Sequence, residues 1–431
     1  MYISKFTKQL IETIKVKKMI VAAVVLGFAA TGNYLYQNSS AATSAVSAEA
    51  ELGTRSGSAT VGQDASASGG TYIVFNQAST DTVPTVPGQQ GEMFIKRTEL
   101  MAKPTSGAGW TFLKTKADAT WGTVQLSDQN LLTQSSVLAG ALVYARTGDA
   151  AYKDKVVIAL KQVCGTETVG TTQLLALART LYGYVVAADL VQMPYSTTCN
   201  NGQTWQQFLT AIRTKPIPGN SRWPTLEVTS ADTSSNWGAY ALSSHLAVSY
   251  ALNDTAAIER DIAIFKRFLG DTTSVAKPFN PTAGYNYNSN GKTWDMSPTL
   301  QRGINPLSAT DARSGALIED ALRLTSGGSD STPCCAVTTV AVDYMEENLD
   351  GSLSTAQLLR AHGVDLTGFQ DQALKRAFDY YWKNGGPGPY SVSRYLPYAI
   401  NYLYGTSYTT QTEDRPYRHM GYGSWLFAGT R

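Results

Sequence analysis

The sequence predicts an all-α main domain that begins near residue 93. From there to the end of the 431-residue chain, apolar residues recur with helical periods, and the apolar–polar alternation that marks strands is scarce. About ten or more helices, arranged as antiparallel pairs, would account for this pattern. The ranges expected to be helical are 131–146, 174–193, 204–213, 237–252, 256–269, 312–325, 337–349, 353–361, 370–383 and 394–404.

Three of these segments have informative boundaries or composition. The helix at 131–146 ends at Gly148, a helix-ending signal. The helix at 174–193 is almost wholly apolar, which indicates a buried position. The connection from 270 to 311 is long and rich in Asn, Pro, Gly and Tyr, and loops of that length usually carry function.

Residues 1–36 have the pattern of an export signal or a membrane anchor. Five lysines between Lys5 and Lys18 precede an apolar run from Met19 to Thr31, and small and polar residues follow. Extended to Tyr36, the run covers about eighteen residues, enough to span a bilayer. A cleaved signal and an anchor through residues 19–36 are both open. In either case we expect an exported body that is secreted, periplasmic or anchored at the cell surface.

Residues 37–92 are expected to form a linker rich in Ser, Ala and Gly. Two pieces of it, 48–51 and 65–75, look like strands of a carbohydrate-binding β-sandwich. They are too short for a whole module, so we expect a short β-like strand pair. The remaining range, 93–431, is the helical domain.

Composition favours an extracellular carbohydrate-active protein. Charged residues make up 16% of the chain, which also has 24 Tyr, 8 Trp and 37 Gly. The formal net charge of +2 provides no broad basic field, so no nucleic-acid partner is expected. An acidic polymer would be bound by local Arg and Lys side chains in a groove. We expect a monomer.

The four cysteines fit an oxidising compartment. Cys164 and Cys199 flank one helical segment, and the adjacent Cys334 and Cys335 either bridge each other or pair elsewhere. All three connectivities remain open. No Cys/His spacing resembles a zinc site, and neither a metal nor a cofactor is expected.

Short motifs along the domain resemble, in order and spacing, the alginate-lyase-like polysaccharide lyases. They lie at 138–149, 177–179, 184–190, 236–238, 304–306, 319–323, 357–360 and 401–405. The resemblance covers most of 93–431. It implies an incomplete (α/α) toroid of antiparallel helix pairs. It also implies an exported enzyme that cleaves alginate or another polyuronate by β-elimination.

Three residues match the chemistry that this elimination needs. A donor must neutralise the sugar carboxylate, a base must remove the adjacent proton, and an acid must protonate the leaving oxygen. The expected catalytic residues are Asn236, Arg323 and Tyr344. An amide and a guanidinium suit the carboxylate, and a tyrosine near a cation can act as base and acid.

Each assignment has a competing interpretation. Asn236 follows two serines and could be only a helix N-cap. Arg323 could form only a helix ion pair with Glu319 or Asp320, and Arg313 competes for its role.

The sequence departs from the family pattern after Asn236. Better-known alginate lyases have a catalytic histidine there, and this chain has Trp237, which shifts the role of base to Tyr344. His245 falls on the opposite face of the same helix from Asn236. His419, the most exposed-looking histidine, is a reserve base.

Aromatic and cationic side chains are expected to bind the polymer, because such mixtures stack on sugar rings and pair with carboxylates. They are Trp237, Tyr240, Tyr285, Trp294, Arg313, Arg415, His419 and Trp425. Several of them have core packing as the alternative role.

Two other functions remain open. A glycoside hydrolase on a helical toroid would use two carboxylates, with candidates in 319–320 and 346–347. A non-catalytic surface glycan-binding protein is the other alternative.

Overall fold

The computed structural model describes part of the chain. The described residues are 59–63, 71–75, 91–168, 174–218, 221–277, 279, 302–310, 314–321, 339–386, 394–419 and 421–428. The chain divides into two compact units, Met1–Thr85 and Val86–Arg431. The predicted anchor segment lies outside the described residues. Within the described ranges, no helix combines the length and the apolar character needed to cross a membrane.

The first unit contains a two-stranded antiparallel sheet. Strand β1, Ala59–Gln63, pairs with β2, Thr71–Phe75, with Ala59 opposite Phe75. Strand β2 overlaps the strand predicted at 65–75. Its partner is β1, whereas the other predicted strand, 48–51, lies outside the described residues.

The second unit is built from helices, and helices make up 58% of the described residues of the chain. This confirms the prediction of an all-α main domain. The helices are α2 Arg97–Ala102, α3 Gly107–Asp118, α4 Thr133–Thr147, α5 Ala150–Val163, α6 Leu174–Leu190, α7 Trp205–Ile212, α8 Leu226–Asp232, α9 Asn236–Ala251, α10 Thr255–Leu269, α11 Ile318–Ala321, α12 Thr339–Ala361, α13 Phe369–Lys383, α14 Leu396–Tyr404 and α15 Gly423–Leu426.

The long apolar segments were predicted with near-correct bounds, and the differences have local causes. Helix α4 ends at Gly148, whose backbone N–H donates to the Tyr144 carbonyl at 2.7 Å, as the glycine signal predicted. Helices α2, α3, α5, α8 and α15 were missed, α5 although Asp149 caps it by accepting a 3.0 Å hydrogen bond from the Ala151 N–H. In the predicted helix 312–325, residues 314–317 are not helical, and α11 begins at Ile318. Two helices were predicted at 337–349 and 353–361, and the structure has the single helix α12.

Gly351 explains why α12 is continuous. A Cβ atom built on this residue would lie 2.6 Å from the backbone carbon of Ala239 in α9. The glycine is therefore required for the close approach of two helices rather than for a break between them.

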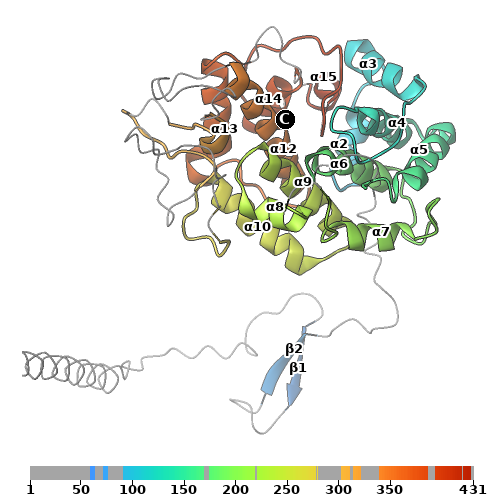
Figure 1. Ribbon diagram of the computed structural model, residues 1–431, viewed down its shortest axis with the longest axis horizontal. Coiled ribbons are helices and arrows are strands. Elements are labelled where there is room, and N and C mark those ends of the chain that lie inside the picture. The colour runs from blue at the N-terminus through green and yellow to red at the C-terminus, as the bar shows by residue number, and fades with distance from the viewer. Residues whose placement is uncertain are drawn as a thin grey trace, which may run out of the picture. The chain divides into compact units, whose positions relative to one another are not determined.

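The packing places α9 in the middle of the unit. Helix α9 contacts α6, α8, α10 and α12, and all its residues except Trp237 and Tyr250 are buried. From α3, contacts run in succession through α4, α6, α9, α12, α14 and α15, and α15 packs back on α3. Figure 1 shows α3 to α6 on one side of α9 and α12, and α13 and α14 on the other.

Two long-range links hold segments of this unit together. A disulfide joins Cys164, at the end of α5, to Cys199, 35 residues further along the chain. Cys334 and Cys335 lie outside the described residues. At the C-terminus, the buried Trp425 packs on Trp110 of α3 at 5.7 Å between ring centroids, and its indole N–H donates to the Pro104 carbonyl at 2.7 Å.

Candidate functional site

The turn between α8 and α9 is held in place by two buried side chains. The Glu319 carboxylate accepts hydrogen bonds from the Thr233 hydroxyl and the Ser234 hydroxyl, both at 2.8 Å. The Asn348 amide, on α12, donates to the Ser234 carbonyl at 2.9 Å. These bonds fix the residues that lead into α9, so the first residue of the helix, Asn236, has a defined position.

The same turn also explains why residue 238 is a glycine. A Cβ atom at this position would lie 1.8 Å from the Thr233 carbonyl oxygen, so no larger residue fits. The Asn236-Trp237-Gly238 motif thus combines an amide at the helix start with a glycine required by the preceding turn.

Asn236 is the first residue of α9 and does not cap it; the N-cap residue is Ser235. The Asn236 amide instead donates to the Glu347 carboxylate on α12. The amide thus binds a carboxylate of the protein itself, and the predicted role of Asn236 toward a sugar carboxylate stays a prediction. The interpretation as a simple N-cap is wrong.

Two arginines join Asn236 at Glu347, and we call these four residues the Glu347 cluster. Arg179 of α6 forms an ion pair with the same carboxylate oxygen that Asn236 binds. Arg418, in the segment before α15, lies 3.5 Å from the other oxygen and also donates to the Gln129 carbonyl. Asn236 is fully buried, and the side chains of Arg179, Glu347 and Arg418 are 6%, 12% and 18% exposed, so solvent reaches the cluster mainly at Glu347 and Arg418 and screens its charges little.

Sequence reasoning assigned no role to Arg179, and it considered Arg418 only as part of the aromatic and cationic stretch 415–425, a possible polymer-binding loop. Arg179 had a detectable signal, because it is the one charged residue between Leu174 and Ala188 in an otherwise apolar buried helix. A buried cation needs a partner carboxylate. Its partner, Glu347, lies 168 residues further along the chain, so no local sequence pattern could identify it.

Tyr344 lies on α12 three residues before Glu347, so the two side chains share a face of the helix. Tyr344 is half-buried. Asp343, one turn before Glu347, is exposed, and its pKa is raised by partial burial and by the Glu347 charge. The predicted partner Arg323 lies outside the described residues, as do Arg313, Tyr285 and Trp294.

His419 was expected to be exposed, and this is wrong: the residue is 1% exposed. Its Nε2 lies 2.8 Å from the Ala178 carbonyl, and its Nδ1 lies 2.9 Å from the Ser243 hydroxyl. Burial lowers its pKa to about 3. Because the ring is buried and both nitrogens bond to groups of the protein, a substrate cannot reach it, and His419 contributes to packing.

The other predicted residue beside His419 is Tyr240, which is fully buried. The Arg179 guanidinium lies 5.6 Å from the Tyr240 ring centroid. Burial, followed by the charge of Asp350, raises the Tyr240 pKa well above 10. Tyr240 thus lines the interior side of the Glu347 cluster rather than a sugar-stacking surface.

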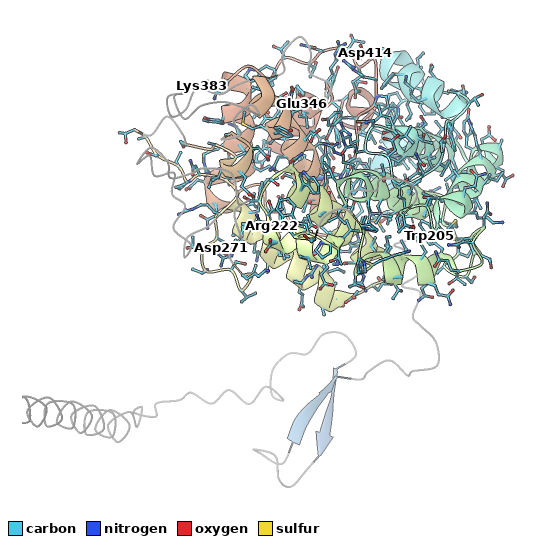
Figure 2. The ribbon with its side chains drawn as sticks, in the orientation of Figure 1. Trp205, Arg222, Asp271, Glu346, Lys383 and Asp414 are labelled. Atoms are coloured by element: carbon cyan, nitrogen blue, oxygen red, sulfur yellow. A yellow bond between two sulfur atoms is a disulfide. The ribbon has the colours of Figure 1, made fainter. Side chains whose placement is uncertain are left out.

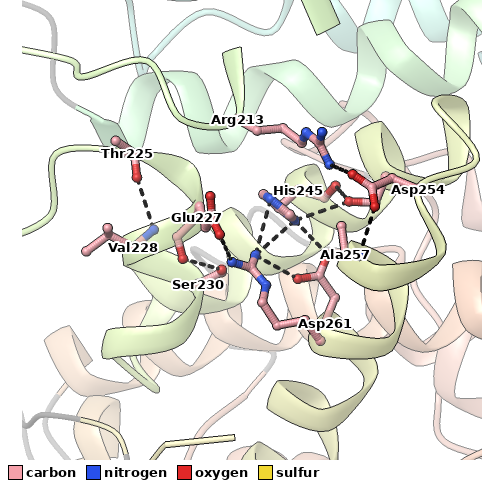
Figure 3. A network of polar contacts seen from close by, with 11 residues as sticks. Arg213, Thr225, Glu227, Val228, Ser230, His245, Asp254, Ala257 and Asp261 are labelled. Atoms are coloured by element: carbon pink, nitrogen blue, oxygen red, sulfur yellow. Dashed lines mark hydrogen bonds and ion pairs between the residues drawn. The ribbon is translucent and has the colours of Figure 1, made fainter. Parts of the chain in front are cut away.

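His245 belongs to a different network, between α9 and α10 (Figure 3). Its Nδ1 lies 2.6 Å from the buried Asp261 carboxylate, and the Arg260 guanidinium donates to the other oxygen of Asp261 at 3.0 Å. Ser249 also approaches the same Nδ1, at 3.3 Å. A catalytic relay needs its acid and its nucleophile on different ring nitrogens, so this is a structural network on the far face of α9 from Asn236.

Trp237 is half-buried beside a second tryptophan. Its ring centroid lies 5.4 Å from that of Trp223, and the Arg222 guanidinium lies 5.1 Å from the Trp223 centroid. Asp232 fixes Trp223 by accepting its indole N–H at 2.9 Å. Trp237, Trp223 and Arg222 thus form an aromatic and cationic group at the start of α9.

Two further polymer-binding candidates are described: Trp425 lies in the core and Arg415 lies at the surface. Trp425 is 1% exposed, so its ring is part of the core and has no open face on which a sugar could stack. Arg415 is exposed and lies 3.8 Å from Asp414, which Figure 2 shows at the edge of the unit.

The carboxylates considered for hydrolysis do not face one another. Glu346 accepts a hydrogen bond from the Tyr381 hydroxyl at 3.2 Å, whereas Glu347 binds Asn236 and Arg179. Figure 2 shows Glu346 farther inside the unit than the surface residue Lys383. Among the described residues, no group of three His, Cys, Asp or Glu side chains could hold a metal ion.

The chain matches no protein-family model, and no curated protein matches it significantly.

Proposed function

We propose that this chain is an exported polysaccharide lyase that cleaves a uronic-acid-containing polymer by β-elimination. The observation that carries the proposal is the convergence of the Asn236 amide and the Arg179 and Arg418 guanidinium groups on one carboxylate. Donors of this kind neutralise a sugar carboxylate, which makes the adjacent C–H acidic. The substrate class is alginate or another polyuronate.

Tyr344 is the proposed base and acid. It lies one helical turn before Glu347 on the same face of α12, which supports a position close to the bound carboxylate. In this mechanism its phenolate removes the proton beside the carboxylate, and the resulting phenol protonates the leaving oxygen. Arg323 remains the proposed cation that favours the phenolate.

We further propose that the helices of the second unit form an incomplete (α/α) toroid. The succession of helix contacts from α3 through α9 and α12 to α15, and from α15 back to α3, supports this arrangement. Trp237 with Arg222 is the proposed surface for a neighbouring sugar of the polymer, with Arg415, Arg313, Tyr285 and Trp294 as further contacts.

A non-catalytic glycan-binding protein is the second candidate function. It is favoured by the occupation of the donor set by Glu347, because donors bound to Glu347 do not neutralise a sugar carboxylate for elimination, whereas binding at Trp237 and Arg222 does not depend on them. Glycoside hydrolysis has less support, because Glu346 and Glu347 bind different partners.

Product analysis separates these functions. The full chain is incubated with a panel of polyuronates, and both ultraviolet absorbance and new reducing ends are recorded. A lyase yields both signals from the unsaturated product, a hydrolase yields reducing ends alone, and a binding protein yields neither.

Asn236→Ala tests the site within the same assay. Loss of one donor to the developing charge is expected to lower kcat by about 100-fold. Asn384→Ala, which removes an amide that donates to the Tyr380 carbonyl in α13, is the matched control and should retain wild-type rates. Equal rates in both variants would remove Asn236 from the mechanism.

A further inference from the structure

The Glu347 cluster has more donors than its one carboxylate uses. In the described part of the chain, the ion pairs of Arg179 and of Arg418 both end on Glu347. The Nε atoms of both arginines and the Tyr240 hydroxyl are buried without a hydrogen-bond partner there. Buried donors of this kind are costly unless a further acceptor satisfies them.

The two oxygens of Glu347 are held unequally. One oxygen accepts the close hydrogen bonds from Asn236 and Arg179. The other has the longer contact of 3.5 Å with Arg418. If the carboxylate turned toward Arg418, it would leave Asn236 and still remain paired, which avoids the large cost of an unpaired buried charge.

We propose that Glu347 is an internal competitor for the substrate, with its carboxylate occupying the place at Asn236 and Arg179 that a uronate carboxylate takes when the polymer binds. This inference rests on the proposed function, because it names the ligand group of the same site. It assigns the site to an anionic sugar, since a neutral sugar cannot replace a carboxylate between these donors. Glu347 is thereby a residue that sets specificity and affinity.

Substitution of a residue that only supports the site would weaken substrate binding, whereas substitution of Glu347 should strengthen it. Glu347→Gln keeps the shape and an acceptor oxygen while removing the charge that repels an incoming carboxylate. The affinity for a uronate oligosaccharide should therefore increase, by about tenfold, since like charges a few ångströms apart repel strongly in a site that water screens little. The affinity for a neutral oligosaccharide should stay as it is.

The test measures binding by calorimetry with the full chain. All variants carry Tyr344→Phe, so that the proposed chemistry does not consume the ligand. The probes are a saturated mannuronate trisaccharide and neutral mannotriose. Glu346→Gln is the matched control: this neighbouring buried carboxylate binds Tyr381, and its removal should change Kd by less than about twofold.

A Kd for the uronate trisaccharide that is unchanged or weaker in Glu347→Gln, with the melting temperature retained, overturns the proposal. If this variant is unfolded at the temperature of the experiment, Glu347→Asp decides. Its shorter side chain keeps the charge but reaches Asn236 less well, so tighter binding than wild type is again expected, and weaker or equal binding overturns the proposal.

The outcome is separable from that of the proposed function. A Kd shift without unsaturated products from the wild-type chain would remove the lyase and leave Glu347 as a competitor in a glycan-binding site. Unsaturated products without a Kd shift would keep the lyase and reject the role of Glu347.

Discussion

Arg179 lies in the middle of an apolar helix, and the Glu347 carboxylate balances its charge. Removal of one partner from such a buried pair typically costs about 3–5 kcal/mol, because the other charge is left unpaired. Variants at this pair therefore need a stability measurement beside every activity measurement. Arg418 is looser and more exposed, so its charge can be varied with less effect on folding.

His419 should make the protein sensitive to acid. Burial lowers its pKa to about 3 in the fold, from an ordinary value of 6.5. The unfolded chain therefore binds a proton that the folded chain does not, and stability falls as the pH drops below about 6.5. At pH 4 the cost is about 3 kcal/mol relative to pH 8.

Urea unfolding at pH 8 and pH 4 measures this effect. His419→Gln should be less stable than the wild type at pH 8 and should lose this part of the pH dependence. His362→Gln is a second test: burial lowers the pKa of this half-buried histidine to about 4, so a part of similar size should disappear. An unchanged pH dependence in His419→Gln would contradict the account.

At the residue scale, a sequence shows the chemical group of each side chain but shows less directly whether that side chain is buried. Asn236 was singled out because its position at a helix start and the resemblance agreed, and its amide donates to the protein's own Glu347 carboxylate. His419 was misjudged, because its neighbours Arg418 and Tyr417 are polar or amphipathic and gave no sign of burial. Only the tertiary fold brings Ala178 and Ser243 to its two ring nitrogens.

At the element scale, the contact of α9 with α12 positions the Glu347 cluster. Asn236 and Tyr240 lie on α9, and Glu347 lies on α12 one turn before Gly351. Because Gly351 lies directly against the α9 backbone, the spacing of the two helices sets the distance between Asn236 and Glu347.

Gly351→Ala should separate these helices. The added methyl group has no room beside Ala239, and overpacking of this kind costs about 1–3 kcal/mol. We expect a lower melting temperature together with a reduced catalytic rate. Gly368→Ala is the control, because a Cβ atom there meets nothing within 4 Å and its φ of −79° suits alanine. Equal melting temperatures for the two variants would contradict the packing argument.

Long apolar helices such as α6 and α9 were predictable from the sequence, whereas α2, α3, α5, α8 and α15 were missed. Two of the errors have an identifiable cause. Glycine often marks the end of a helix, but it also permits two helices to pack closely. Because Gly351 was interpreted as a helix end, α12 was predicted as two helices. Asp149 caps α5, but the helix that follows has only four buried residues, so its apolar stripe is weak.

At the scale of the whole molecule, the C-terminal segment connects distant parts of the helical unit. Arg418 and His419 reach α6 and α12, and α15 packs on α3 and α14. Such pairings depend on contacts between residues hundreds of positions apart, which local patterns in one sequence do not encode. The arrangement of the helices was therefore expected from resemblance rather than from periodicity.

Trp425→Ala should act on stability and not on substrate binding. The buried indole packs on Trp110 and bonds to Pro104, and removal of a buried tryptophan costs about 3–5 kcal/mol. Thermal unfolding should show a large loss, whereas KM of the folded protein for the polymer should stay near the wild-type value. A raised KM without loss of stability would restore the substrate-binding role predicted from the sequence.

The central claim is β-elimination at the Glu347 cluster with Tyr344 as the proton carrier. The measurement that tests it most directly is the ultraviolet absorbance of polyuronate incubated with wild type, Tyr344→Phe and Tyr398→Phe. Tyr398 donates to the Gln411 carbonyl near the surface, so its substitution makes the same chemical change away from the cluster. We expect a rise in absorbance with wild type and Tyr398→Phe, and a rate at least about 100-fold lower with Tyr344→Phe. A rise of equal rate with Tyr344→Phe, or no rise with wild type on any polyuronate, would contradict the account.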